Sequence, residues 1–258
     1  MGILQTQDLT VRFGGHVAVN AVSCRFEPGT LTAIVGPNGA GKTTYFNLIS
    51  GQLPASEGRV HLDGKELTAL SASARTRAGL GRAFQLTNLF PHLTVLENIR
   101  LAVQATESGN HLRGLNLWSI WEDHSKLTQL AESILEQVAM VPQAQSVVAS
   151  LPHGDQRKLE VALLMALRPS VYMFDEPTAG MSQDEAPVIL DLIRQLKRDK
   201  SKTILLVEHK MDVVRELADR IIVLHNGQLV ADGEPAEVMA SAVVQEAYLG
   251  AKPKEIAS

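Results

Sequence analysis

Nine consecutive residues in the first fifth of the chain have the types and spacing of a phosphate site. They are Gly36, Pro37, Asn38, Gly39, Ala40, Gly41, Lys42, Thr43 and Thr44, and they fit the pattern G-x-x-x-x-G-K-[ST] in full. The glycines let the backbone bend so that successive N–H groups point inward. Lys42 then reaches the β- and γ-phosphates, and the Thr43 hydroxyl can complete a Mg²⁺ shell. The stretch predicts a site for a nucleoside triphosphate; the alternative is a glycine-rich turn with an incidental Lys-Thr pair.

Two carboxylates follow an apolar run further along the chain. Val171–Phe174 predicts a buried strand, and Asp175 and Glu176 come directly after it. This places both side chains at the carboxyl end of a strand, where ligands of open α/β sheets bind. Asp175 is predicted to hold Mg²⁺, directly or through water, and Glu176 to orient or deprotonate an attacking water. The alternative is a solvated acidic strand end.

The elements that must position these residues alternate between strand and helix. Leu31–Val35 is a β-branched apolar run before the glycine-rich stretch, and Thr44–Ile49 begins a helix after it. The predicted strands are 3–13, 17–26, 30–35, 59–62, 171–174, 203–207 and 220–224. Helical spacing dominates 94–140, with a loop-like interruption at 108–125, and further helices are predicted at 187–197 and 211–217. This order predicts a mostly parallel sheet with crossover helices.

Composition narrows the class of protein. The chain has 258 residues, with 24 basic and 28 acidic side chains and a net charge of −4, which predicts no polycationic surface for nucleic acid. The lone Cys24 excludes an internal disulfide, fits a reducing compartment, and is interpreted as a small packed residue. We expect neither a secretory signal nor a membrane-spanning helix, so any membrane-spanning part would belong to another chain.

With Asp175-Glu176 and the run Thr203–His209, nearly the whole chain resembles the ATP-binding subunits of ABC transporters. The resemblance implies that ATP and Mg²⁺ are bound. It implies that Phe13 stacks on adenine, that Gln85 links the γ-phosphate and Mg²⁺ to a helical subdomain, and that His209 contacts the γ-phosphate. Phe13 could instead pack inside a β-subdomain, and Gln85 and His209 could be ordinary surface residues.

The resemblance also implies the fold class. It is an α/β P-loop NTPase core with a mostly parallel sheet, an N-terminal antiparallel β-subdomain and an inserted helical subdomain. The whole of 1–258 is expected to form one ATP-binding domain, with residues 1–84 and 166–258 in the nucleotide-binding core and residues 85–165 in the helical subdomain.

The family's signature sequence, Leu-Ser-Gly-Gly-Gln, is altered in this chain. The matching segment begins Leu151-Pro152-His153-Gly154-Asp155. In the family this motif caps the γ-phosphate of the partner subunit across a head-to-tail dimer. Pro152 offers neither a hydroxyl nor an N–H, whereas Gly154 and the helix expected to start near Asp155 can still present N–H groups in trans. Ser182 likewise stands where the family usually has an acidic residue.

Three further stretches indicate the branch of the family. Residues 12–19, 89–99 and 246–250 look like subunits that energise branched-chain amino acid uptake; urea and short-chain amide importers look similar. The expected function is ATP hydrolysis coupled to solute import through separate permease subunits, as a homodimer or heterodimer of ATP-binding subunits, with a solute-binding protein as an indirect partner. The expected location is the cytoplasmic face of the inner membrane. Two alternatives are a soluble ABC protein not tied to transport and a nucleotide-dependent regulator.

Two tryptophans lie in the loop-like interruption. Trp118 and Trp121 could dock a permease loop, or they could fill the small core of the helical subdomain.

Overall fold

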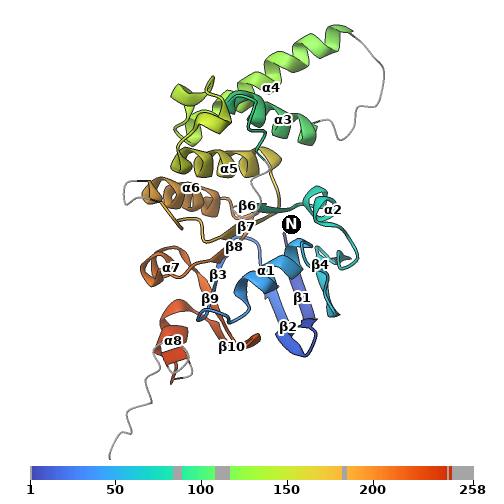
Figure 1. The fold of residues 1–258 in the computed structure, drawn as a ribbon, viewed down its shortest axis with the longest axis vertical. Coiled ribbons are helices and arrows are strands. Elements are labelled where there is room, and N and C mark those ends of the chain that lie inside the picture. Colours follow the sequence, from blue (N-terminus) through green and yellow to red (C-terminus); the bar gives the residue numbers. More distant parts are fainter. Residues whose placement is uncertain (1, 84–88, 108–116, 182–184, 243, 246–258) are drawn as a thin grey trace, which may run out of the picture. The chain divides into compact units, whose positions relative to one another are not determined.

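The computed structural model describes residues 2–83, 89–107, 117–181, 185–242 and 244–245 (Figure 1). They fall into two compact units. The first comprises residues 1–82, 170–176 and 197–258, and the second comprises 83–169 and 177–196. The predicted boundaries at 84/85 and 165/166 stay a prediction.

A six-stranded sheet forms the centre of the first unit. Its order is β10-β9-β3-β8-β7-β6, with bounds β3 Leu31–Val35, β6 Leu80–Ala83, β7 Val171–Asp175, β8 Thr203–Val207, β9 Arg220–His225 and β10 Gln228–Gly233. β3 pairs in parallel with both β8 and β9, β7 pairs in parallel with β8, and β10 runs antiparallel to β9. Every residue of β3, β7 and β8 is buried, because helices and a second sheet cover these strands.

A four-stranded antiparallel sheet completes the first unit. Its order is β2-β1-β4-β5, with bounds β1 Leu4–Phe13, β2 His16–Phe26, β4 Glu57–Leu62 and β5 Lys65–Glu66. One hydrophobic core joins it to the larger sheet through α1 (Lys42–Ser50), and Phe26, Tyr45 and Phe46 are fully buried there. The first unit also contains α2 (Ala72–Arg77), α7 (Met211–Leu217) and α8 (Pro235–Ala240).

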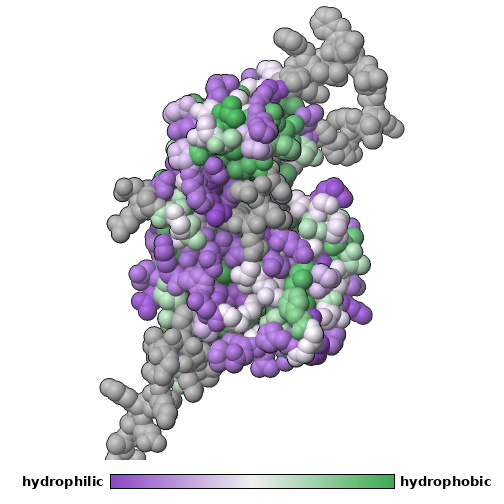
Figure 2. Space-filling view, in the orientation of Figure 1, coloured by the Kyte–Doolittle hydropathy of each residue, from purple (hydrophilic) through white to green (hydrophobic). Residues whose placement is uncertain are grey.

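The second unit is helical. It contains α3 (Val95–Glu107), α4 (Leu117–Gln137), two short 3-10 turns at Val141–Gln143 and Val148–Ser150, α5 (His153–Leu167) and most of α6 (Ala186–Arg198). α3 packs against both α4 and α5. The part of Figure 2 that holds these helices shows green hydrophobic residues among purple hydrophilic ones, and Phe90, Val141 and Val147 are exposed hydrophobic side chains of this unit.

The expected fold class is confirmed, with an antiparallel sheet, a mostly parallel sheet and inserted helices. One local prediction is wrong, because α4 begins at Leu117, inside the segment 108–125 that was expected to be a loop. The apolar residues from Leu117 to Trp121 continue the helical spacing that follows them, and they outweigh the loop-like composition before them. In the described part of the chain, no helix is long and apolar enough to cross a membrane.

Candidate functional site

The glycine-rich stretch forms the turn between β3 and α1, as its flanking patterns predict. Two of its glycines are required by close backbone contacts. A Cβ on Gly36 would lie 2.1 Å from the carbonyl oxygen of Leu224, and a Cβ on Gly41 would lie 2.6 Å from that of Ala18. Gly41 also adopts a left-handed φ of 95° directly before Lys42 begins the helix. A tight turn that leads into a helix in this way is suited to bind an anion, because the first N–H groups of a helix have no partner within the helix.

Lys42 lies inside this turn with 5% of its surface exposed. Its Nζ donates hydrogen bonds to the carbonyl oxygens of Gly36, at 2.7 Å, and Pro37, at 2.9 Å. Desolvation lowers the pKa of Lys42, whereas the nearby carboxylates of Asp175 and Glu176 raise it. The cation is thus held at the mouth of the phosphate loop by neutral oxygen atoms and faces two negative groups.

The strand order brings distant parts of the sequence to the same edge. In the ladders, Val207 of β8 pairs with Ile34 of β3 on one side and with Asp175 of β7 on the other. Because the three strands are parallel, the segments that follow them leave the sheet at the same level. These segments carry the phosphate loop, Glu176 and His209, and all three lie in the first unit.

Asp175 ends β7 and is buried. Its Oδ2 accepts a hydrogen bond of 2.7 Å from a terminal nitrogen of Arg82, and the two side chains are only 5% and 6% exposed. Burial raises the pKa of Asp175, and the Arg82 guanidinium opposes that shift. Composition and motifs do not identify Arg82 as a site residue. The structure places it in the short strand Leu80–Ala83, which the sequence does not predict.

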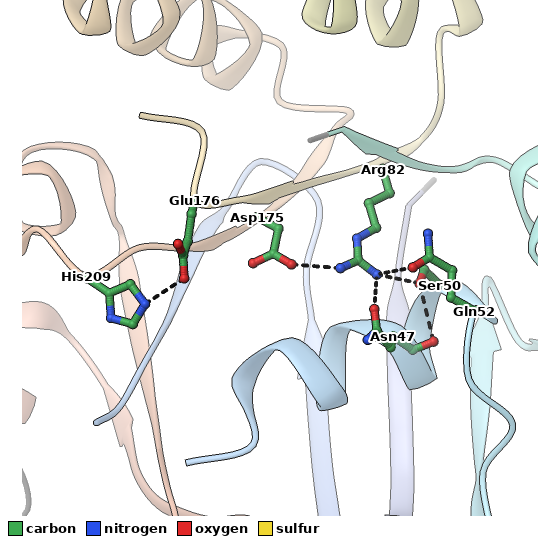
Figure 3. Close-up of polar contacts among 7 residues, drawn as sticks. All are labelled: Asn47, Ser50, Gln52, Arg82, Asp175, Glu176 and His209. Carbon is green, nitrogen blue, oxygen red and sulfur yellow. Dashed lines mark hydrogen bonds and ion pairs between the residues drawn. The ribbon is translucent and has the colours of Figure 1, made fainter. Parts of the chain in front are cut away.

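Glu176 turns sharply away from β7. Its backbone N–H donates to the carbonyl of Val207 at 2.9 Å, and its φ of 49° lies in the left-handed region, which is strained for a residue with a Cβ. This turn brings Glu176 Oε1 to 2.6 Å from Nε2 of His209 (Figure 3). Because an ionised carboxylate only accepts hydrogen bonds, Nε2 carries the hydrogen in this pair.

The backbone beside His209 is held by the preceding residue. Glu208 is buried, and its Oε2 accepts from the N–H groups of His209, at 2.9 Å, and Lys210, at 3.2 Å. This turn immediately after β8 sets the direction in which the imidazole leaves the sheet. The structure therefore brings together Lys42, Asp175, Glu176 and His209, which the sequence assigned to one site.

The other predicted site residues have different positions. Phe13 ends β1 and is 52% exposed, so it does not pack in the core of the β-subdomain. Thr43 lies in the first turn of α1 and is partly exposed. Gln85 and Ser182 lie outside the described residues, as do the side chains of Trp118 and Trp121.

The altered signature segment begins α5 in the second unit. The helix starts at His153, two residues before the predicted start, and Pro152 is its N-cap without a side-chain cap. Proline fits this position because an N-cap residue has extended ψ, here 155°, and its N–H is not part of the helix. Gly154 is buried, and the carboxylate of Glu185 occupies the space that a Cβ would take, with Oε1 only 1.9 Å from it.

Comparison with known proteins identifies the family of this chain. The family model described as "ABC transporter" matches residues 19–179, and a model described as "Branched-chain amino acid ATP-binding cassette transporter" matches residues 228–253. The chain belongs to the ABC transporter family. This cassette is 36% identical over 249 residues, 96% of the chain, to the branched-chain amino acid transport ATP-binding proteins BraF of Pseudomonas aeruginosa and LivG of Escherichia coli K12, and covers 98% of each.

Solved structures agree with the family assignment. The ATP-binding cassette MJ1267 in its ADP conformation has a TM-score of 0.77 and 30% identity, and the match covers 97% of this chain and all of that one. As a member of the ABC transporter family, the chain is an ATP-binding cassette with ATPase chemistry, and the resemblance noted in its sequence is confirmed.

Proposed function

We propose that this cassette hydrolyses Mg²⁺-bound ATP to drive branched-chain amino acid import through a separate membrane permease. The observation that carries the hydrolytic part is the cluster of Asp175, Glu176 and His209 at the carboxyl edge of the sheet, with Lys42 beside it. A protein that only bound nucleotide would have no need for a strained Glu176 held against His209. This arrangement favours turnover over the role of a nucleotide-dependent regulator.

The residues present fit a magnesium ion. Asp175 supplies a carboxylate and Thr43 a hydroxyl, both oxygen donors of the kind that Mg²⁺ prefers, and Gln85 is the third proposed ligand. Asp175 is buried and its Oδ2 accepts from Arg82, so its other oxygen, Oδ1, is the proposed donor to the cation. When bound, Mg²⁺ neutralises charge that develops on the β- and γ-phosphate oxygens.

Each remaining residue has a distinct proposed role. The phosphate loop, Gly36 to Thr44, holds the β- and γ-phosphates with its N–H groups and Lys42. Glu176 orients the attacking water and accepts its proton. His209 Nε2–H, which lies against Glu176 Oε1 in the structure, donates to the γ-phosphate when nucleotide is bound. Phe13, exposed at the end of β1, offers a free ring face for adenine.

The proposed assembly is a homodimer or a heterodimer with a second cassette. In it, Gly154 and the start of α5 reach the nucleotide of the partner. The permease would hold the dimer at the cytoplasmic face of the inner membrane. Supporting this, among the side chains that the structure describes, the exposed large hydrophobic ones other than Phe13 lie in the helical unit: Phe90, Leu101, Val141 and Val147. A solute-binding protein would be an indirect partner.

The choice of solute rests on the names of the relatives. BraF and LivG are branched-chain amino acid transport proteins, and a second family model of that description matches residues 228–253. These similarities favour branched-chain amino acids over urea or short-chain amides.

Two measurements test this function. Purified cassette should release phosphate from ATP in the presence of Mg²⁺, and Glu176→Gln should slow that release at least a hundredfold because an amide does not accept the proton. Cells that lack this chain should lose uptake of labelled leucine and keep uptake of labelled urea. Loss of urea uptake alone would reject the proposed solute, and normal turnover by Glu176→Gln would reject the proposed catalytic carboxylate.

A further inference from the structure

Arg82 connects the two parts of the first unit that carry the proposed magnesium ligands. One terminal nitrogen of its guanidinium donates to Asp175 Oδ2 at 2.7 Å. The other donates to Asn47 Oδ1 at 2.7 Å and to Ser50 Oγ at 2.9 Å, both on α1. A longer bond of 3.2 Å reaches Gln52 Oε1 just beyond the helix. Figure 3 shows the guanidinium between the carboxylate and the end of α1.

The surroundings of Arg82 fix its position. The side chain is 6% exposed, and its Cζ lies 5.3 Å from the centre of the Phe46 ring, which is itself fully buried. A planar guanidinium with donors in a rigid fork can bind a carboxylate and several neutral oxygens at once, which the single ammonium of lysine cannot do in the same geometry. The contacts therefore tie β7 to α1 through one buried group.

This connection matters because α1 also carries Thr43 in its first turn. Thr43 and Asp175 come from different elements, and a metal ion that binds both needs their oxygens at a constant separation. Arg82 occupies Asp175 Oδ2, and Figure 3 shows the second carboxylate oxygen on the side facing away from Arg82. Arg82 thus holds the carboxylate in one orientation and leaves one oxygen to face the nucleotide side.

We propose that Arg82 is a positioning residue for the divalent cation: it fixes Asp175 relative to α1 so that the carboxylate and Thr43 form a preorganised pair of metal ligands. Arg82 contacts neither the metal nor the phosphates. This inference rests on the proposed function, because it requires that the site bind a metal–nucleotide complex. Preorganised ligands lose less conformational freedom on binding than ligands that must first be ordered, so a fixed Asp175 raises the affinity for the metal.

Arg82→Lys distinguishes the effect of the positive charge from the effect of the several hydrogen bonds that the guanidinium makes. Lysine keeps a positive charge beside Asp175 but cannot hold the carboxylate and the α1 oxygens together. The probe is Mn²⁺, titrated in the presence of saturating ADP and followed by the electron paramagnetic resonance signal of the free ion. We expect the variant to bind Mn²⁺ about tenfold more weakly, which corresponds to about 1.4 kcal/mol. Affinity for ADP in EDTA should change less than twofold, because the phosphate loop and Lys42 are intact.

A second variant keeps the ion pair and removes one anchor on α1. Asn47→Ala deletes the 2.7 Å contact to Arg82 and leaves Arg82–Asp175 in place, so it should weaken Mn²⁺ binding two- to threefold. If Arg82→Lys does not fold, the Mn²⁺ affinity of Asn47→Ala still tests whether Arg82 positions Asp175.

Arg220→Lys is the matched control. Arg220 also forms an ion pair, with Asp232, and also lies over a buried phenylalanine, Phe26, in the same unit. It should lower thermal stability without changing Mn²⁺ affinity. Unchanged Mn²⁺ affinity in Arg82→Lys, or an equal loss of metal-free ADP binding, would overturn the proposal, because Arg82 would then support only the general fold. Absence of ADP-dependent Mn²⁺ binding by the unaltered protein would instead contradict the proposed function itself.

Discussion

Lys42 lies between neutral oxygens of its own loop and two carboxylates. Its ammonium bonds to two carbonyl oxygens of its own loop, Gly36 and Pro37, and it faces the carboxylates of Asp175 and Glu176. Phosphate oxygens would offer it stronger, charge-assisted hydrogen bonds than neutral carbonyls do. The bonds within the loop hold the cation in a buried position beside the proposed phosphate site.

Lys42→Ala is expected to weaken ATP binding by about 10- to 100-fold, since a hydrogen bond to a charged group contributes roughly 1.5 to 3 kcal/mol. Isothermal titration calorimetry measures this directly. Lys197→Ala is the control, because Lys197 also donates to a backbone carbonyl, that of Leu217, and forms an ion pair with Asp219. Unchanged ATP affinity in Lys42→Ala would show that the loop does not bind phosphate.

Burial of Cys24 in the first unit predicts how stability depends on pH. Cys24 is buried, as its sequence context predicted, and burial raises the pKa of its thiol from 9.0 to about 11. The folded state therefore holds the proton more tightly than the unfolded state. The resulting stabilisation is fully present below pH 9 and is lost as the pH rises to 11, by at most about 3 kcal/mol.

The expected result is that urea denaturation midpoints fall less between pH 8 and pH 10.5 in Cys24→Ala than in the unaltered protein. Burial raises the pKa of Tyr45 and Cys24 raises it further, so the two groups titrate as a coupled pair and the difference between the two proteins reports on both. Identical pH dependence in the two proteins would mean that the thiol does not titrate differently on folding.

Among the elements, the buried strands were the most predictable from sequence. β3, β7 and β8 are continuous apolar runs because both faces of the sheet are covered, and β8 begins and ends at the predicted residues. β6, in contrast, reads Leu-Gly-Arg-Ala, with a glycine and a charged residue that disfavour a strand, and its place at the sheet edge beside β7 is a tertiary effect. Arg82 was missed for the same reason, because its partners lie 35 and 93 residues away.

The residue at the start of α5 determines which groups the altered signature segment can offer to a phosphate. Pro152 is the N-cap and offers no side-chain oxygen, so Pro152→Ser would add a hydroxyl that can either cap the helix or reach a phosphate of the partner subunit. A cap contributes about 1 kcal/mol, which roughly offsets the 0.4 to 1 kcal/mol of chain order lost with proline. Stability should therefore change little.

We expect Pro152→Ser to raise ATP turnover by about tenfold or more, because a hydrogen bond to the charged γ-phosphate in a closed site contributes roughly 1.5 to 3 kcal/mol. Steady-state phosphate release measures the effect. Pro152→Ala is the control, since it removes the ring without adding a hydroxyl, and it should not gain activity. Equal rates in the serine and alanine variants would mean that the nucleotide is capped without a side chain at position 152.

For the whole molecule, the strand order explains how a local motif becomes a site. The phosphate loop, Glu176 and His209 follow β3, β7 and β8, and the order β3-β8-β7 places their exits side by side. These residues could be predicted from the sequence, because each comes shortly after an apolar run that predicts a buried strand. The second half of the proposed site, Gly154 and the start of α5 of a partner cassette, follows only from the family resemblance, because no pattern along one chain shows what a second chain contributes.

Glu176→Gln tests the proposed dimer. The amide keeps the shape of the side chain, so ATP should still bind, whereas hydrolysis should slow at least a hundredfold and leave the closed dimer as the stable species. Light scattering in ATP and Mg²⁺ should then give about twice the mass of the 28.0 kDa chain, and ADP should give the monomer mass. Lys42→Ala introduced into the same variant is the control, since it should bind ATP about 10- to 100-fold more weakly and, at an ATP concentration that just saturates Glu176→Gln, leave most chains without nucleotide. If the double variant dimerises as well as Glu176→Gln, the association does not depend on ATP. If Glu176→Gln stays monomeric with ATP bound, a different cassette must supply the second half of the site.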